Sequence, residues 1–207
     1  AEVWVGVRSQ SLFENYSTIW IRIVAAGSVW GYHIGGIWQD VFLLALPKVH
    51  VEDVYVKPLV SKNMLELEVT VQNNTEKKTD LQLQGKINEW VNLAGTDVNS
   101  APVPAWELGQ EALKVAPVKV SIPANASTKV VLQVPVSGEL SYWTPEQPNL
   151  YAVLLSLQAK KEILDMKYER FGWREWTLQG TTQYLNGKPY QLRGDSWHFM
   201  GIPQMTR

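Results

Sequence analysis

Short stretches of alternating apolar and polar residues recur along most of the chain. The clearest stretch is 65–72, where leucine and valine alternate with glutamate, threonine and glutamine. A period of two predicts a strand with one buried face and one solvent-facing face. The same pattern predicts further strands at 51–56, 81–87, 115–122, 128–136, 151–157 and 163–171. This series of short strands, over about 120 residues, favours an all-β, immunoglobulin-like sandwich of two sheets.

The alternation weakens between residues 91 and 113. Pro102, Pro104 and Gly109 interrupt this stretch. Because proline and glycine break regular elements, we expect a long excursion from the sheet here, with one or two helical turns over 106–113.

Two apolar stretches, 2–7 and 37–46, precede the sandwich and predict additional strands around a glycine-rich aromatic loop at 27–36. After the sandwich, Asn186-Gly187 predicts a two-residue hairpin turn, because both central positions of a type I′ turn need positive φ. The hairpin then leads into a dense polar cluster over 193–198.

Composition excludes several classes of function. The chain has 207 residues and a formal net charge of −1, which argues against nucleic acid or an anionic membrane as a partner. Cysteine is absent, so disulfides and thiol chemistry are excluded. Because His33, His50 and His198 lack the spacing of metal ligands, we expect no metal and no cofactor. His50 begins a strand and is expected to be structural.

Aromatic residues are abundant, with ten tryptophans and eight tyrosines. One interpretation is aromatic packing in a β protein, since aromatic residues favour strands. The other is sugar recognition, in which the C–H faces of pyranose rings stack on indoles. Composition alone does not choose between them.

Four motifs occur in a characteristic order. They are GIWQDV at 36–41, WTPEQPNLY at 143–151, FGWRE at 171–175, and LNGKP at 185–189 continuing into LRGDSWH at 192–198. Together they resemble glycoside hydrolase family 2, which includes β-galactosidases, β-glucuronidases, β-mannosidases and exo-β-glucosaminidases. The resemblance implies a jelly-roll sugar-binding domain, an immunoglobulin-like sandwich and a TIM barrel. Trp143 and Tyr151 are expected to hold the sandwich against the barrel.

On that layout the chain is expected to be a fragment. Residues 1–47 resemble the C-terminal part of the jelly roll, 48–178 the complete sandwich, and 179–207 the lead-in hairpin and first barrel strand. A whole barrel takes about 250 residues. The family's two catalytic glutamates, an acid/base and a nucleophile in a retaining mechanism, lie on later strands. We therefore expect the chain by itself to hydrolyse nothing and to position the barrel.

The resemblance assigns the polar cluster to a sugar site. Arg193 and His198 match the family's Arg-Gly-x-x-x-His, at the strand end where TIM barrels place their sites. His198 is expected to contact the sugar, and Arg193 to anchor acidic groups inside the barrel. Asp195 either accepts from sugar hydroxyls or pairs with Arg193. Trp197, where galactosidases have arginine, resembles the mannosidase and glucosaminidase pattern and serves either as a stacking platform or in barrel packing.

The leading hypothesis is the middle region of a retaining exo-β-glycosidase, similar to a β-galactosidase or β-mannosidase, whose partner is the carbohydrate substrate of the full-length enzyme. The alternatives are a non-catalytic carbohydrate-binding or adhesion module and a relic that has lost its glutamates. Residues 37–46 would expose an apolar edge, which predicts either a homodimer through 1–47 or disorder of that segment. Periplasmic or secreted localisation is favoured over cytoplasmic.

Overall fold

The computed structural model describes residues 4, 6, 41, 43–94, 104–160 and 162–194. The chain divides into two compact units, Ala1–Ala45 and Leu46–Arg207. The first unit is described at only a few positions. The strands predicted at 2–7 and 37–46, the loop at 27–36, and the homodimer through 1–47 therefore remain predictions. The elements below all belong to the second unit.

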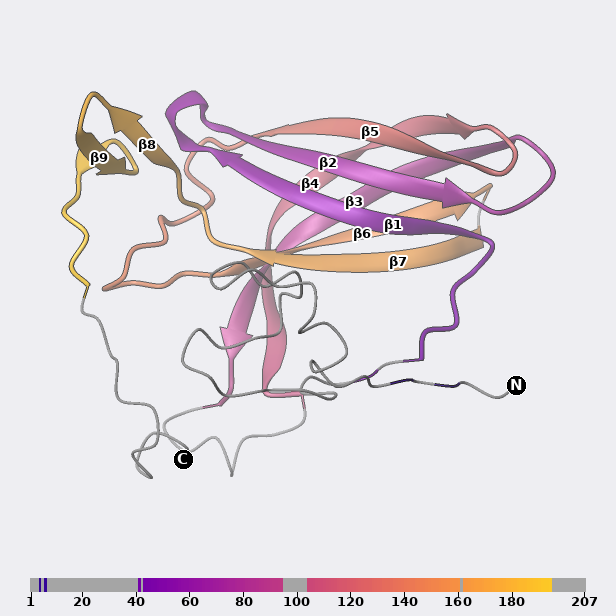
Figure 1. Cartoon of the computed structure of the whole chain (residues 1–207), viewed down its shortest axis with the longest axis horizontal. Helices are drawn as coiled ribbons and strands as arrows, with labels where there is room; N and C mark the ends of the chain where they lie inside the picture. The colour runs from indigo at the N-terminus through magenta and orange to yellow at the C-terminus, as the bar shows by residue number, and fades with distance from the viewer. Residues whose placement is uncertain are drawn as a thin grey trace, which may run out of the picture. The chain divides into compact units, whose positions relative to one another are not determined.

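Two antiparallel sheets form a β-sandwich, as the alternating pattern predicted (Figure 1). The three-stranded sheet has the order β1-β2-β5, and the four-stranded sheet has the order β4-β3-β6-β7. The strands of the first are β1 (Val49–Leu59), β2 (Met64–Asn73) and β5 (Ala126–Pro135), with the 3-10 turn η2 (Val60–Lys62) after β1. Those of the second are β3 (Thr79–Asn92), β4 (Trp106–Ile122), β6 (Tyr151–Ala159) and β7 (Glu162–Phe171).

The core lies between the two sheets. On β2 the alternation is strict: Leu65, Leu67, Val69 and Val71 are 0% exposed, while the residues between them are partly exposed. The four-stranded sheet supplies the opposing side chains, among them Leu83, Ile87, Val153, Leu155 and Leu157. Burying each such side chain stabilises the fold by roughly 1.5–3 kcal/mol. Each strand therefore turns its apolar face towards the core.

One edge of the sandwich is held by polar contacts between the sheets. The Val51 backbone N–H donates to Asp165 Oδ2 at 2.8 Å. Lys167 Nζ donates to the Glu52 carbonyl nearby. Strands β1 and β7 therefore lie side by side where the two sheets meet.

The helical turns expected over 106–113 are wrong, because β4 begins at Trp106 and Asn92 pairs with Trp106 at the far end of β3. The β3–β4 register shifts at three places, between 83 and 85, 87 and 88, and 88 and 90. Each bulge adds a residue to one strand and so breaks the period of two that sequence analysis relies on. Pro117 is tolerated because β4 is an edge strand and the proline falls within a bulge.

A small third sheet follows the sandwich, in the order β10-β9-β8. Its strands are β8 (Trp176–Gln179), β9 (Thr182–Leu185) and β10 (Lys188–Pro189). The turn between β9 and β10 has φ of 51° at Asn186 and 75° at Gly187, which confirms the predicted positive-φ turn. Residues 190–194 then continue without a regular element.

No helix in the part of the chain that the structure describes is long and apolar enough to cross a membrane.

Candidate functional site

The predicted sugar site lies almost wholly outside the described residues. Of its four members, Arg193 is described and exposed, whereas Asp195, Trp197 and His198 are not described. No ion pair joins Arg193 to another described residue. The roles given to these four residues therefore remain predictions. What the structure does describe is how the segment that leads to them is held.

Asn186 ties the C-terminal hairpin to the sandwich. Its backbone N–H donates to the Glu175 carbonyl at 2.9 Å, and its Oδ1 accepts from the Glu175 N–H at 2.9 Å. Its Nδ2 donates to the Trp143 carbonyl at 3.1 Å. Asparagine suits this position twice, because it tolerates the left-handed conformation and offers both a donor and an acceptor. We call these three hydrogen bonds the hairpin clamp.

Trp143 is the sandwich side of this clamp. Its N–H donates to the Trp173 carbonyl at 3.0 Å, and the Arg174 guanidinium lies 4.1 Å from its ring centroid, a cation–π distance. A Cβ atom placed on Gly172 would come within 2.9 Å of the indole. Glycine is therefore required at 172 for the indole to lie against the backbone.

Two further hydrogen bonds fix the base of the clamp. The Ser61 N–H, in η2, donates to Glu175 Oε2 at 2.7 Å. The Tyr151 hydroxyl accepts from the Ser141 N–H at 2.8 Å, which resembles the tyrosine corner that fixes a loop in immunoglobulin-like domains. Both sheets therefore hold the segment from which the hairpin leaves.

Three of the sequence motifs meet at this junction, namely 143–151, 171–175 and 185–189. The side-chain hydrogen bonds of Asn186 could not be predicted from the sequence. An asparagine before a glycine is already explained by the turn, so it gives no sign of a second role. Glu175 gave no signal either, since its partner Ser61 lies 114 positions away.

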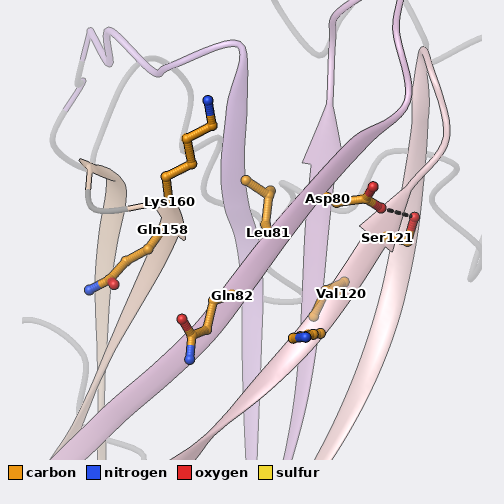
Figure 2. A pocket seen from close by; sticks show the side chains of 8 residues that line it. Asp80, Leu81, Gln82, Val120, Ser121, Gln158 and Lys160 are labelled. Atoms are coloured by element: carbon orange, nitrogen blue, oxygen red, sulfur yellow. Dashed lines mark hydrogen bonds between the residues drawn. The ribbon is translucent and has the colours of Figure 1, made fainter.

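Two hollows on the described surface are open to solvent. One of about 470 Å³ lies at the end of the four-stranded sheet, where Ser121 Oγ donates to Asp80 Oδ1 at 2.5 Å (Figure 2). A second, of about 480 Å³, lies over the hairpin between Thr181 and Leu192, with no charged residue in its lining. Neither brings together the paired carboxylates that glycoside hydrolysis requires.

The described residues contain no group of three or more histidine, cysteine, aspartate and glutamate side chains arranged to hold a metal ion. His50 is buried, and its Nδ1 donates to the Pro47 carbonyl at 2.8 Å. Since a carbonyl oxygen can only accept, Nδ1 carries the proton. His50 is thus structural, as its position at the start of a strand predicted.

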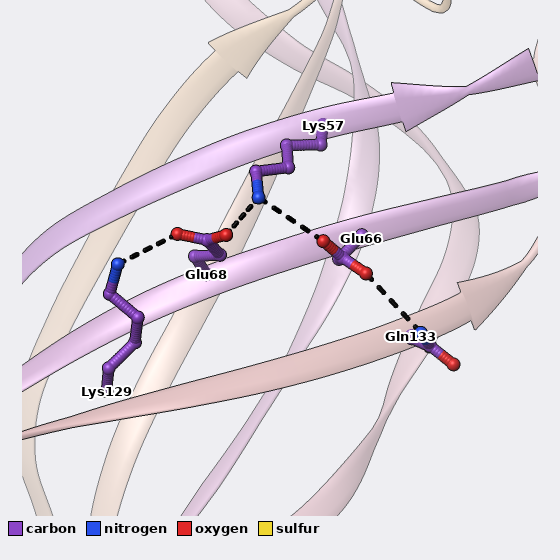
Figure 3. A network of polar contacts seen from close by, with 5 residues as sticks. All are labelled: Lys57, Glu66, Glu68, Lys129 and Gln133. Atoms are coloured by element: carbon purple, nitrogen blue, oxygen red, sulfur yellow. Dashed lines mark hydrogen bonds and ion pairs between the residues drawn. The ribbon is translucent and has the colours of Figure 1, made fainter.

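A ladder of charges covers the outer face of the three-stranded sheet (Figure 3). Lys57 bonds to both Glu66 and Glu68, and Lys129 lies 2.9 Å from Glu68. The hydrogen bond from Lys57, followed by that from Lys129, lowers the pKa of Glu68. The hydrogen bond to Glu68 raises the pKa of Lys57. All these charges face solvent and are paired, so this face offers no site.

Comparison with known proteins places the chain in a family. The family model described as glycosyl hydrolases family 2 matches residues 49–174. The match covers the whole sandwich and includes Trp143 of the hairpin clamp. The chain belongs to glycosyl hydrolase family 2. The resemblance drawn from the four motifs is thereby confirmed.

The chain matches only a small part of each relative. The chain is 30% identical over 167 residues to a putative β-glucuronidase of Formosa agariphila, covering 79% of this chain and 17% of that protein. It is 26% identical to a β-galactosidase of Priestia megaterium, covering 81% and 15%. A crystal structure of a Bacteroides uniformis β-glucuronidase matches with a TM-score of 0.59 at 27% identity, covering 83% and 20%. The chain therefore spans about a fifth or less of the length of these relatives.

Proposed function

We propose that this chain is the middle region of a retaining exo-β-glycosidase that removes terminal β-linked sugars, as a β-galactosidase or a β-mannosidase does. The support is membership of glycosyl hydrolase family 2 together with relatives named as a β-glucuronidase and a β-galactosidase. The observation that carries the proposal is the hairpin clamp. It joins the matched sandwich to the strand that leads to Arg193.

In this proposal the sandwich does no chemistry itself. Its work is to set the direction in which residues 190–194 leave, so that the following barrel strand meets the rest of the active site. Positioning of this kind matters because a displacement of about 1 Å costs on the order of a hundredfold in rate. Three hydrogen bonds at Asn186 and one at Glu175 supply the rigidity.

The proposed site residues then have distinct tasks. His198 donates to a sugar hydroxyl, and the bond strengthens as charge develops in the transition state. Asp195 accepts from a sugar hydroxyl, and Trp197 offers its indole to the ring face. Arg193 holds acidic groups of the barrel as a bidentate donor. The two glutamates of the double displacement are supplied by polypeptide beyond this chain.

The test is hydrolysis of a panel of aryl β-glycosides by the longer polypeptide that contains this chain. We expect turnover of one or more of the galactoside, glucuronide and mannoside, and none by the 207-residue chain alone. The His198→Ala variant should lose about 10²–10³ in kcat, as removal of a transition-state donor does. Lys188→Ala, exposed on the same hairpin, is the matched control. Turnover by the isolated chain, or none by the longer polypeptide, would contradict the proposal.

A further inference from the structure

The outer face of the four-stranded sheet carries an aromatic platform, formed by Trp90, Trp106 and Tyr168. Trp90 and Trp106 stack with ring centroids 4.0 Å apart and planes 20° from parallel. Tyr168 stands on β7, at the opposite edge of the sheet from β4, yet its ring lies 5.2 Å from Trp106 and 6.1 Å from Trp90. Trp106 therefore reaches from its edge strand over the sheet.

Burial beneath the platform shows how closely it covers the sheet. Asn88 and Ala152 are paired residues on this outer face, but they are only 6% and 0% exposed. Asn88 Nδ2 donates to the Gly109 carbonyl at 2.9 Å, whereas Asn88 Oδ1 has no partner among the described residues. A buried acceptor without a donor is uncommon in a folded protein. The floor of the platform thus retains one unsatisfied polar atom.

A row of positive charge runs beside the platform. Lys86 pairs with Lys114 on β4 and with Leu154 on β6, and Leu154 pairs with Tyr168. The two lysines and the tyrosine are therefore in one row across the sheet. Like charges directly opposite each other destabilise a strand pair, and neither lysine forms an ion pair with another described residue. This differs from the ladder on the other sheet, where Lys57 and Lys129 both reach carboxylates.

A hollow of about 320 Å³ lies at the lysine row. Its lining includes Lys86, Lys114, Leu154, Ser156 and Met166, with Glu111 as its only carboxylate. Arg170 adds a further cation, 5.2 Å from the Trp90 ring. The face thus combines a cluster of three aromatic rings, two stacked and the third tilted against them, with an excess of cations.

We propose that this face binds an acidic oligosaccharide, one whose sugar rings carry carboxylate or sulfate groups. An aromatic face is the negative part of the ring quadrupole, so it attracts the weakly positive C–H face of a pyranose. The lysine row supplies charge complementarity for the anionic groups. An apolar hollow with few convergent polar groups is the usual form of a ligand site. The inference does not rest on the proposed glycosidase activity.

The test uses two probes that differ only at C6, the β-1,4-linked hexamers of mannuronate, which carries a carboxylate there, and of mannose, which carries a hydroxymethyl group. Calorimetric titration of the 207-residue chain should show tighter binding of the mannuronate hexamer, weakening with salt because exposed charges are screened. Trp106→Ala and Tyr168→Ala should each weaken binding by about tenfold, as loss of an aromatic contact does. Since Tyr168 is 50% exposed, its removal spares the core even if Trp106→Ala fails to fold.

The double variant Lys86→Gln and Lys114→Gln should bring the mannuronate affinity down to that of the mannose hexamer. The matched controls are Tyr55→Ala and Lys129→Gln, which remove an exposed aromatic and a lysine from the three-stranded sheet and should change nothing. A sulfated mannose hexamer tests whether the face binds sulfate groups as well as carboxylate groups. Equal affinity for charged and neutral probes, or equal losses in the controls, would overturn the proposal. So would loss of binding in the longer polypeptide, because another domain would then cover this face.

Discussion

The sandwich and the C-terminal hairpin are stabilised in different ways. The sandwich has one continuous core to which every strand from β1 to β7 contributes. The C-terminal hairpin, here taken with β8 as the small sheet of β8, β9 and β10, has strands of two to four residues. Leu185 is the only buried residue in these three strands. A small sheet of this kind is marginal by itself. Its position depends on polar contacts at Asn186 and Glu175.

The difference separates folding from positioning. Apolar burial is non-directional and makes the sandwich stable. Hydrogen bonds are directional and each contributes only about 0.5–1.5 kcal/mol, so they fix an angle without adding much stability. A substitution in the core should therefore unfold the sandwich and the hairpin together. A substitution in the clamp should free the hairpin and leave the sandwich folded.

The largest effect is expected from Leu67→Ala. Leu67 is 0% exposed in the middle strand of its sheet, so its truncation leaves a cavity and should lower the free energy of unfolding by about 2–5 kcal/mol. Urea denaturation followed by circular dichroism measures this. A loss confined to the hairpin would contradict the idea that the sandwich carries the stability.

Gly172→Ala should come next, because a Cβ there would contact the Trp143 ring at 2.9 Å. Overpacking of this kind costs about 1–3 kcal/mol. We expect the displaced indole to change the near-ultraviolet circular dichroism more than the melting temperature. Gly138→Ala is the control. A Cβ at Gly138 meets no atom within 4 Å, so this variant introduces only the backbone strain of alanine at a φ of 113° and no contact with an aromatic ring.

Tyr151→Phe tests the base of the clamp on the sandwich side. It removes the acceptor of the Ser141 N–H and should lower the free energy of unfolding by about 1 kcal/mol. Because Tyr151 is buried and packs on Phe171 at 5.9 Å, the ring should stay in place. An unchanged free energy would mean that water replaces the hydroxyl without cost.

The smallest effect is expected from Glu68→Gln, and it should depend on pH. The pKa of Glu68 is lowered, so its stabilisation is present above the ordinary glutamate pKa and is lost as pH falls through the lowered value. The pKa of Lys57 is raised, so its share is present below the ordinary lysine pKa and is lost as pH rises through the raised value. The variant should be slightly less stable than the wild type at neutral pH and equal to it in strong acid. A difference that persists in acid would indicate lost packing.

How far the sequence predicts this structure depends on the kind of signal. The alternating pattern predicted the sandwich, because burial of one face of each strand requires this alternation. Asn186-Gly187 predicted the turn, because few residues accept positive φ. The start of β4 was missed because bulges near Gly85 and Asn88 break the period. The clamp was missed because hydrogen bonds between distant residues leave no local pattern. The aromatic platform was missed because Trp106, which stacks on Trp90, lies in the region predicted as an excursion.

The most direct test of the positioning role is amide hydrogen exchange in the Asn186→Gly variant. Glycine keeps the φ of 51° but removes both side-chain hydrogen bonds, worth about 1–3 kcal/mol together. Amides of 176–190 should exchange about 10–100-fold faster, with β2 and β6 unchanged. Asn125→Gly, at φ 49° in the turn before β5, is the matched control and should leave the hairpin unchanged. Uniform acceleration in both regions, or none in the hairpin, would contradict the account.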